Sequence, residues 1–195
     1  MKLSVSSLVV LLLSITMSCN NQSTAASVGN VDLLGFTKVS IPGSDVTLVT
    51  KKDQEGKMLE QGFIRNGQKN GSWTIFHDNE SIKSITNFIN GVLNGAYLEF
   101  NKRGQLEKRV EYLDNQFDGL YSEYKYGRPL KEITYENGVQ QGPFRIWNDM
   151  GKLTQRGQNK NGKLNGTLQY FNDDEELIMQ YEYKEGEVES GGMVN

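Results

Sequence analysis

Residues 90–100 read NGVLNGAYLEF, with two glycines four positions apart and each preceded by asparagine. Aromatic residues follow the second glycine at the second and fifth positions, Tyr97 and Phe100. A ligand-binding loop should occur once in a chain, whereas a structural repeat should recur at a fixed step. The pattern does recur, so this stretch marks one unit of a repeat.

The glycines of this pattern return along most of the chain. Counterparts of the second glycine are Gly71, Gly95, Gly119, Gly142 and Gly166, at steps of 24, 24, 23 and 24 residues. Counterparts of the first are Gly67, Gly91, Gly138, Gly162 and Gly186, with Asn115 in the remaining place. Asparagine is the next best residue where the backbone needs a positive φ. Five full units and a partial sixth therefore cover about residues 55–190.

The aromatic residues keep the same step in two rows. The first row follows the second glycine by two positions and contains Trp73, Tyr97, Tyr121, Phe144 and Leu168. The second row follows it by five positions and contains Phe76, Phe100, Tyr124, Trp147 and Phe171. Positions three apart on an unbroken strand lie on opposite faces, so either a bulge intervenes or both faces carry rings. We expect most rings to form the core, and an exposed row to be a binding surface.

Each unit contains two segments of strand length separated by turn residues, which is typical of β-hairpins. The NG pairs supply positive φ for tight turns. A second turn position holds Gly56, Gly104, Gly127 and Gly151, with Glu80 and Glu175 in the same place. One 24-residue hairpin cannot bury its own apolar face, so neighbours must stack. The sequence predicts an all-β, elongated, single-sheet solenoid of stacked antiparallel hairpins.

The amino-terminal residues are typical of a targeting signal. Lys2 precedes the apolar run 8–13, and the sole cysteine, Cys19, follows short residues. This pattern predicts a lipoprotein signal peptide over 1–18, lipid on Cys19 and a polar tether over 19–30. The alternative is an ordinary secretory signal. Residues 31–54 are expected to form a cap or degenerate repeat, and 191–195 a tail.

Composition and motifs give no evidence of an enzyme. The net charge is −3 with both signs interspersed, so no basic footprint for nucleic acid exists. His77, the only histidine, is expected at the surface, and DDEE at 173–176 is expected to form a solvated turn. Glu99 and Glu123 share a register position, and their pairing for acid–base work is the weakest alternative. We expect no catalytic residue, metal or cofactor.

The pattern resembles MORN repeats (membrane occupation and recognition nexus), most closely their short bacterial variant. The resemblance rests on NGQKNGSWTIF, NGVLNGAYLEF, NQFDGLYSEY, NGVQQGPFRIW and NGKLNGTLQYF, which begin at residues 66, 90, 115, 137 and 161. It implies a scaffold or binding surface of β-hairpins, with no single ligand and no catalytic residues. Some bacterial relatives carry an antitoxin label.

Two functional hypotheses follow. The first is a protein-interaction scaffold held at the bacterial cell envelope by lipid and facing the periplasm. The second is binding of glycans or cell-wall polymers through an aromatic row, because rings can stack on sugars. An antitoxin-like role, as in the relatives' label, is a more distant third.

Overall fold

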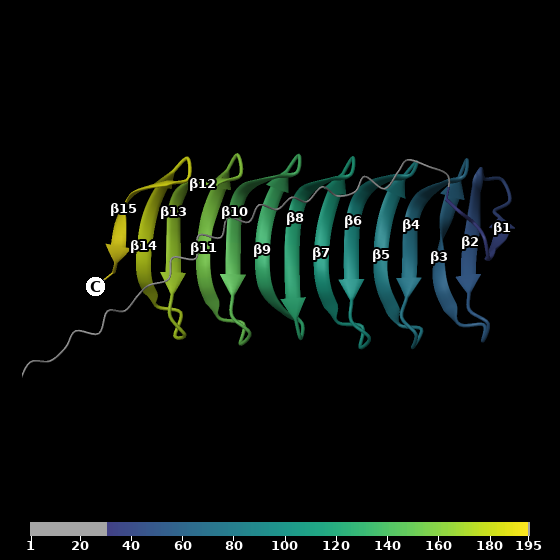
Figure 1. Ribbon diagram of the computed structural model, residues 1–195, viewed down its shortest axis with the longest axis horizontal. Helices are drawn as coiled ribbons and strands as arrows, with labels where there is room; N and C mark the ends of the chain where they lie inside the picture. The colour runs from purple at the N-terminus through teal and green to yellow at the C-terminus, as the bar shows by residue number, and fades with distance from the viewer. Residues whose placement is uncertain (1–30, 195) are drawn as a thin grey trace, which may run out of the picture.

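The computed structural model describes residues 31–194, which form one open antiparallel sheet of 15 strands with no helix (Figure 1). The strands are β1 (Phe36–Ser40), β2 (Val46–Lys52), β3 (Met58–Arg65), β4 (Gln68–Phe76), β5 (Ile82–Ile89), β6 (Val92–Phe100), β7 (Leu106–Leu113), β8 (Gln116–Lys125), β9 (Arg128–Glu136), β10 (Val139–Trp147), β11 (Leu153–Lys160), β12 (Lys163–Leu164), β13 (Gly166–Phe171), β14 (Leu177–Lys184) and β15 (Glu187–Met193). Nothing in this range is a helix long and apolar enough to cross a membrane. The predicted signal peptide, Cys19 and tether lie outside the described residues.

The strands follow one another in space as they do in the chain. Each strand pairs with the next, except that the short β12 pairs only with β11 and β13 continues the order beside β11. β1 and β15 therefore lie at opposite ends of an elongated single layer (Figure 1). The predicted solenoid of antiparallel β-hairpins is confirmed.

The NG turns lie along one long edge of the sheet, called here the tip edge. Asn90 and Gly91 have φ angles of 48° and 82°, the pair of positive values that a two-residue type I′ turn requires. Asp114 and Asn115 adopt 49° and 67°, so asparagine does replace the glycine that breaks the sequence series. The same backbone conformation recurs at every tip of the repeat region.

The second glycine of each unit lies within a strand at a wide bulge. Between the pairs Thr86–Tyr97 and Phe88–Leu93, three residues of β6 centred on Gly95 face one residue of β5. The φ of Gly95 is 93°, which favours glycine. The bulge recurs around Gly71, Gly119 and Gly142, and at Gly166 it divides the strand into β12 and β13. This explains why both glycines recur.

The other long edge, called the loop edge, carries longer connections with one exception. Phe100 and Leu106 are paired across the loop 101–105. In the next unit Tyr124 pairs with Pro129, and a two-residue turn at Tyr126–Gly127 replaces the longer loop. That connection is one residue shorter, which accounts for the single step of 23 residues.

One face of the sheet, called the core face, carries the first aromatic row. Each buried ring is paired with smaller residues on both sides, as in Gly62–Trp73–Thr86 and in Ile133–Phe144–Gly157. The buried side chains form two clusters: Val49, Ile64, Trp73 and Phe88 in the first, and Ile133, Phe144 and Leu168 in the second. A thin sheet thus builds its core by lining up one row of large residues against small partners.

The first cluster is covered by residues 31–36, which precede and begin β1. Val31, Leu33 and Phe36 pack against it, and the Phe36 and Trp73 rings are 5.8 Å apart. The backbone N–H of Val31 donates to the carbonyl oxygen of Gly67 at 2.9 Å. This segment and the β1–β2 hairpin occupy the end of the sheet where the sequence predicts a cap.

Candidate interaction surfaces

The first aromatic row stabilises the fold. Trp73 and Leu168 are each only 2% exposed, and Phe144 is also buried. Tyr97 and Tyr121 are half-buried in the same row. These predicted binding aromatics therefore lie in the core face, and their buried rings are not accessible to a partner.

Trp73 has polar as well as apolar neighbours. Its indole Nε1 donates to Glu60 Oε2 at 3.1 Å, and Lys69 Nζ lies 4.1 Å from its ring centroid. Burial lowers the pKa of Lys69, and the charge of Glu60 partly opposes that shift. The indole N–H and its aromatic face are thus both used inside the fold.

The middle of the core face is polar. Glu99 is paired with Lys108, which is in turn paired with Glu123 on the next strand. The Tyr97 hydroxyl donates to Glu99 at 3.0 Å, and the Tyr121 hydroxyl donates to Glu123. A lysine therefore separates the two carboxylates that share a register position, and the acid–base pairing has no geometric support.

Tyrosines on this face are shielded from solvent. Burial, followed by the hydrogen bond and charge of Glu99, raises the pKa of Tyr97. Burial also raises the pKa of Tyr112 and of Tyr170. These hydroxyls stay protonated at neutral pH, and that of Tyr97 donates a hydrogen bond to Glu99.

The second aromatic row lies on the opposite, outer face. β4 is continuous from Trp73 to Phe76. The register with β5 shifts next to Phe76 because Lys83 is an extra, unpaired residue in β5. Strand alternation therefore puts the two rings on opposite faces. The same arrangement holds in each unit, and all five side chains of the row are half-buried: Phe76, Phe100, Tyr124, Trp147 and Phe171.

Apolar partners extend this row into a band across the sheet. The cross-strand partners of the five rings are Ile82, Leu106, Pro129, Leu153 and Leu177. Rings of successive units are two strands apart, or about 9.6 Å. Within residues 31–194 no second layer covers the outer face. A regular, partly exposed apolar band of this kind is a candidate contact surface.

The tip edge is held together by side chains that sequence analysis did not single out. Asn70 Oδ1 accepts a bond from the backbone N–H of Asn90 in the next tip at 3.3 Å. Asp118, Gln141 and Asn165 bond to the backbone of the following tips in the same way. The sequence does contain a pattern that could have identified these side chains, because an amide or acidic residue precedes the second glycine in every unit.

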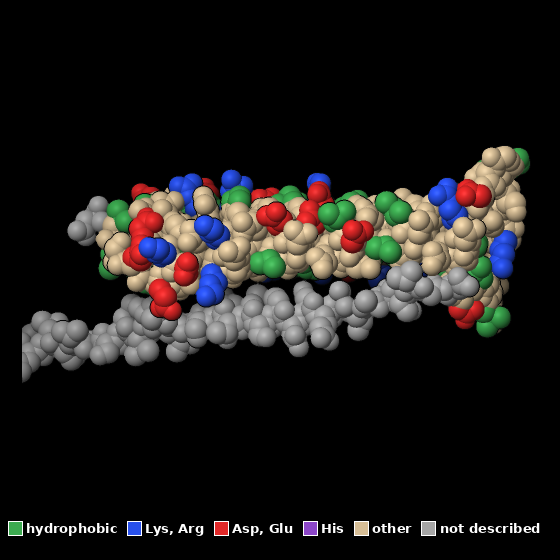
Figure 2. Space-filling model, turned by 90° about the horizontal axis from the view of Figure 1, so that it is seen from above, with side chains coloured by type: hydrophobic (Ala, Val, Ile, Leu, Met, Phe, Trp, Pro, Cys, Tyr) green, Lys and Arg blue, Asp and Glu red, His purple; other side chains and the backbone are tan. Residues whose placement is uncertain are grey.

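Exposed side chains of several kinds lie along the tip edge. Figure 2, which looks onto this edge, shows apolar and acidic side chains interspersed along its middle and charged side chains of both signs gathered toward the end that carries β15. Exposed apolar residues here include Ile89, Leu113 and Val139. They are separate side chains rather than a continuous band.

Neighbouring loops on the loop edge are also bonded to one another. His77 Nε2 lies 2.9 Å from the Phe100 carbonyl oxygen and is half-buried, so the predicted surface histidine joins two units. Lys102 and Asp78 form an ion pair at 2.7 Å that lowers the pKa of Asp78. Lys125 pairs with Asp149, which raises the pKa of that lysine.

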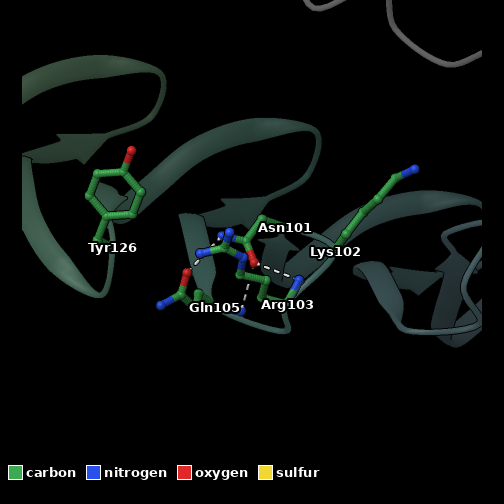
Figure 3. Close-up of a pocket in the computed structure, with 5 residues that line it drawn as sticks. All are labelled: Asn101, Lys102, Arg103, Gln105 and Tyr126. Carbon is green, nitrogen blue, oxygen red and sulfur yellow. Dashed lines mark hydrogen bonds between the residues drawn. The ribbon is translucent and has the colours of Figure 1, made fainter.

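One junction on this edge lacks such bonds among the described residues. Between loop 101–105 and the turn at Tyr126 lies a depression of about 320 Å³. Figure 3 shows the Arg103 guanidinium beside Asn101 and Gln105, while Lys102 points away from Tyr126. The short turn thus leaves a gap between two loops, with Tyr126 70% exposed.

The acidic stretch 173–176 is a turn. Asn172 Oδ1 accepts the backbone N–H groups of Asp174 and Glu176, each at 2.9 Å. Glu175 occupies the glycine position with φ 61° and accepts the backbone N–H of Leu153 at 3.0 Å. No group of three or more acidic, histidine or cysteine side chains in residues 31–194 is arranged to hold a metal ion.

Two comparisons with known proteins found no match: no protein-family model matches the chain, and no curated protein matches it.

Proposed function

We propose that this chain is a non-enzymatic scaffold of MORN-like repeats that holds a protein partner at the bacterial cell envelope. Lipid on Cys19 anchors it, residues 19–30 act as the tether, and the repeat domain faces the periplasm. The second aromatic row is the contact surface. The signal-like amino terminus and the repeat pattern, both features of the sequence, support the anchored scaffold.

The observation that carries the proposal is the outer band. The core face uses its own aromatic row internally, whereas the outer row is half-buried with no layer over it in the described residues. Tyr124 and Trp147 also carry polar atoms that can bond across an interface. Aromatic residues with a polar atom are favoured at protein contacts.

Glycan binding is the second candidate, and the spacing of the band favours it. Rings repeated at about 9.6 Å offer a regular series of stacking surfaces to a polymer with a regular repeat. Hydrogen-bonding side chains such as Gln169 and Gln180 lie on the same face, joined to each other at 2.7 Å. A protein partner does not require this regularity.

The test is crosslinking capture of the full-length lipidated protein from its own cells. Wild type is expected to retain a recurrent, stoichiometric protein. The double variant Tyr124→Ala/Trp147→Ala is expected to lose it. Tyr126→Ala is the matched control, because it removes an exposed ring that lies off the band. Retention of glycan fragments without any protein would overturn the scaffold in favour of the second candidate.

Membrane attachment is tested separately by fractionation. Cys19→Ser is expected to move the protein from the membrane to the soluble fraction. An unchanged distribution would contradict lipid anchoring without affecting the partner test.

A further inference from the structure

Two arginines face each other on the outer face. Arg145 of β10 is paired directly with Arg156 of β11. Both residues are exposed. Like charges directly opposite one another destabilise a sheet. Two cationic residues in directly opposite positions therefore need an explanation beyond folding.

Equivalent cross-strand pairs in the other hairpins carry no such repulsion. They are Thr74–Ile85, Leu98–Arg109, Ser122–Glu132 and Gln169–Gln180. The repeat thus accepts neutral, apolar or singly charged pairs at this position. The arginine pair is particular to one hairpin and is not imposed by the architecture.

Neighbouring groups neutralise the pair only in part. Glu132 Oε2 lies 3.5 Å from Arg145 Nη1. Arg156 Nε donates to Gln169 Oε1 at 2.6 Å, and its guanidinium carbon lies 5.2 Å from the Phe171 ring centroid. These contacts hold the arginines in place but supply one carboxylate for two cations.

The arginine pair adjoins the aromatic band. Arg145 and Trp147 are two positions apart on β10 and therefore share the outer face. Arg156 is already placed over Phe171. The guanidinium groups of the two arginines and the partly buried rings of Trp147 and Phe171 consequently lie on one surface at this hairpin.

We propose that an acidic segment of the protein partner docks on this surface, placing carboxylates on Arg145 and Arg156 beside Trp147. Guanidinium groups bind carboxylates through two parallel hydrogen bonds, so a second carboxylate completes the charge balance that Glu132 begins. The inference rests on the proposed scaffold function and specifies its partner. Charge complementarity identifies the occupant, because a neutral or basic segment would leave the repulsion in place.

The test measures binding of a labelled poly-glutamate peptide to the full-length protein in detergent, by fluorescence anisotropy, with poly-glutamine as the neutral probe. The double variant Arg145→Gln/Arg156→Gln is expected to weaken poly-glutamate binding at least about tenfold. Lys52→Gln/Arg103→Gln, which removes the same charge from exposed positions elsewhere, is expected to leave it within about twofold of wild type. Poly-glutamine should not bind.

Thermal unfolding of the same variants separates recognition from structure. The arginine double variant should melt close to the wild-type temperature, because relief of the like-charge repulsion offsets the loss of the exposed Glu132 ion pair and the Phe171 contact. A clear fall in melting temperature would assign the arginines a structural role and overturn the proposal. If both double variants bind poly-glutamate equally more weakly than wild type, the arginines act only through the net charge of the protein. That result would also overturn the proposal.

Two further outcomes distinguish this inference from the proposed function. If the arginine double variant still captures the cellular partner, the acidic docking site is wrong and the scaffold stands. If binding is confined to polygalacturonate and absent for poly-glutamate, the arginine pair serves an acidic polysaccharide and the protein-partner proposal fails.

Discussion

The two faces of this sheet carry aromatic rows with the same period and different environments. On the core face the row includes Trp73 and Leu168, each 2% exposed. On the outer face the row that includes Tyr124 and Trp147 is half-buried along its whole length. The period is therefore a property of the architecture, and we expect function in the outer row, no member of which is fully buried.

Small residues mark the same contrast. Glycines such as Gly62 stand opposite the large rings of the core face and leave room for them. The pairs between the aromatic rows on the outer face include no glycine, and three of the five consist of polar or charged residues: Ser122–Glu132, Arg145–Arg156 and Gln169–Gln180. One face is thus constrained by volume, and the other by charge and hydrogen bonding.

The largest expected effect is a difference between the two tryptophans. Trp73→Ala should lower the free energy of unfolding by about 3–5 kcal/mol, because a fully buried ring is removed. Trp147→Ala should cost less, about 1–2 kcal/mol, because its ring is only partly buried. Urea unfolding of the two variants measures both values. Equal losses would show that both rows belong to the core.

A second prediction uses glycine to test the volume constraint. A Cβ added at Gly62 would lie 2.2 Å from a ring carbon of Trp73, so Gly62→Ala should cost about 1–3 kcal/mol through overpacking. Gly192 lies opposite Gln180, and a Cβ there would meet nothing within 4 Å. Gly192→Ala should stay within about 0.5 kcal/mol of wild type. Similar losses in the two variants would contradict the packing argument.

The sequence was sufficient to predict the all-β solenoid, its period and its turns. Glycine and asparagine are required where φ is positive, and that requirement is local to the chain. Alternation left open whether a bulge brings Trp73 and Phe76 to one face, and it could not say which row is buried, because both rows are largely aromatic.

Features that depend on pairing between units were not predictable. Lys108 separates Glu99 from Glu123 only because of the register between β6, β7 and β8. The pairing of Arg145 with Arg156 depends on a bulge at Thr154 of β11, where the register with β10 shifts. Sequence spacing alone does not set these registers.

The third prediction concerns a buried polar atom of the outer face. Ser122 is fully buried beside Arg109 and Glu132, and its hydroxyl has no hydrogen-bond partner among the described residues. Ser122→Ala should therefore raise the free energy of unfolding by about 1 kcal/mol. The comparison variant is Ser72→Ala, which loses a 2.8 Å bond to Asn87 and should be destabilised by up to about 1 kcal/mol. Destabilisation by Ser122→Ala would mean that its hydroxyl is satisfied.

The smallest expected effect is a pH dependence from the core face. Burial first, and then Glu99, raises the pKa of Tyr97, so the folded protein keeps this hydroxyl protonated where an unfolded tyrosine, with a pKa of about 10, ionises. The stabilisation that the raised pKa of Tyr97 gives the folded state is complete below about pH 10 and is lost progressively as the pH rises above that value. Tyr97→Phe should therefore flatten the fall in stability between about pH 10 and 11, measured by urea unfolding against wild type.

Glu99→Gln sharpens this last test by keeping the tyrosine and removing the charge. Because burial is the larger cause, most of the alkaline fall should remain in that variant, whereas Tyr97→Phe removes its share entirely. If Glu99→Gln and Tyr97→Phe flatten the profile equally, the carboxylate and not burial controls the tyrosine. The middle of the core face would then behave as a charged surface, and the contrast between the two faces would hold only for the two apolar clusters at its ends.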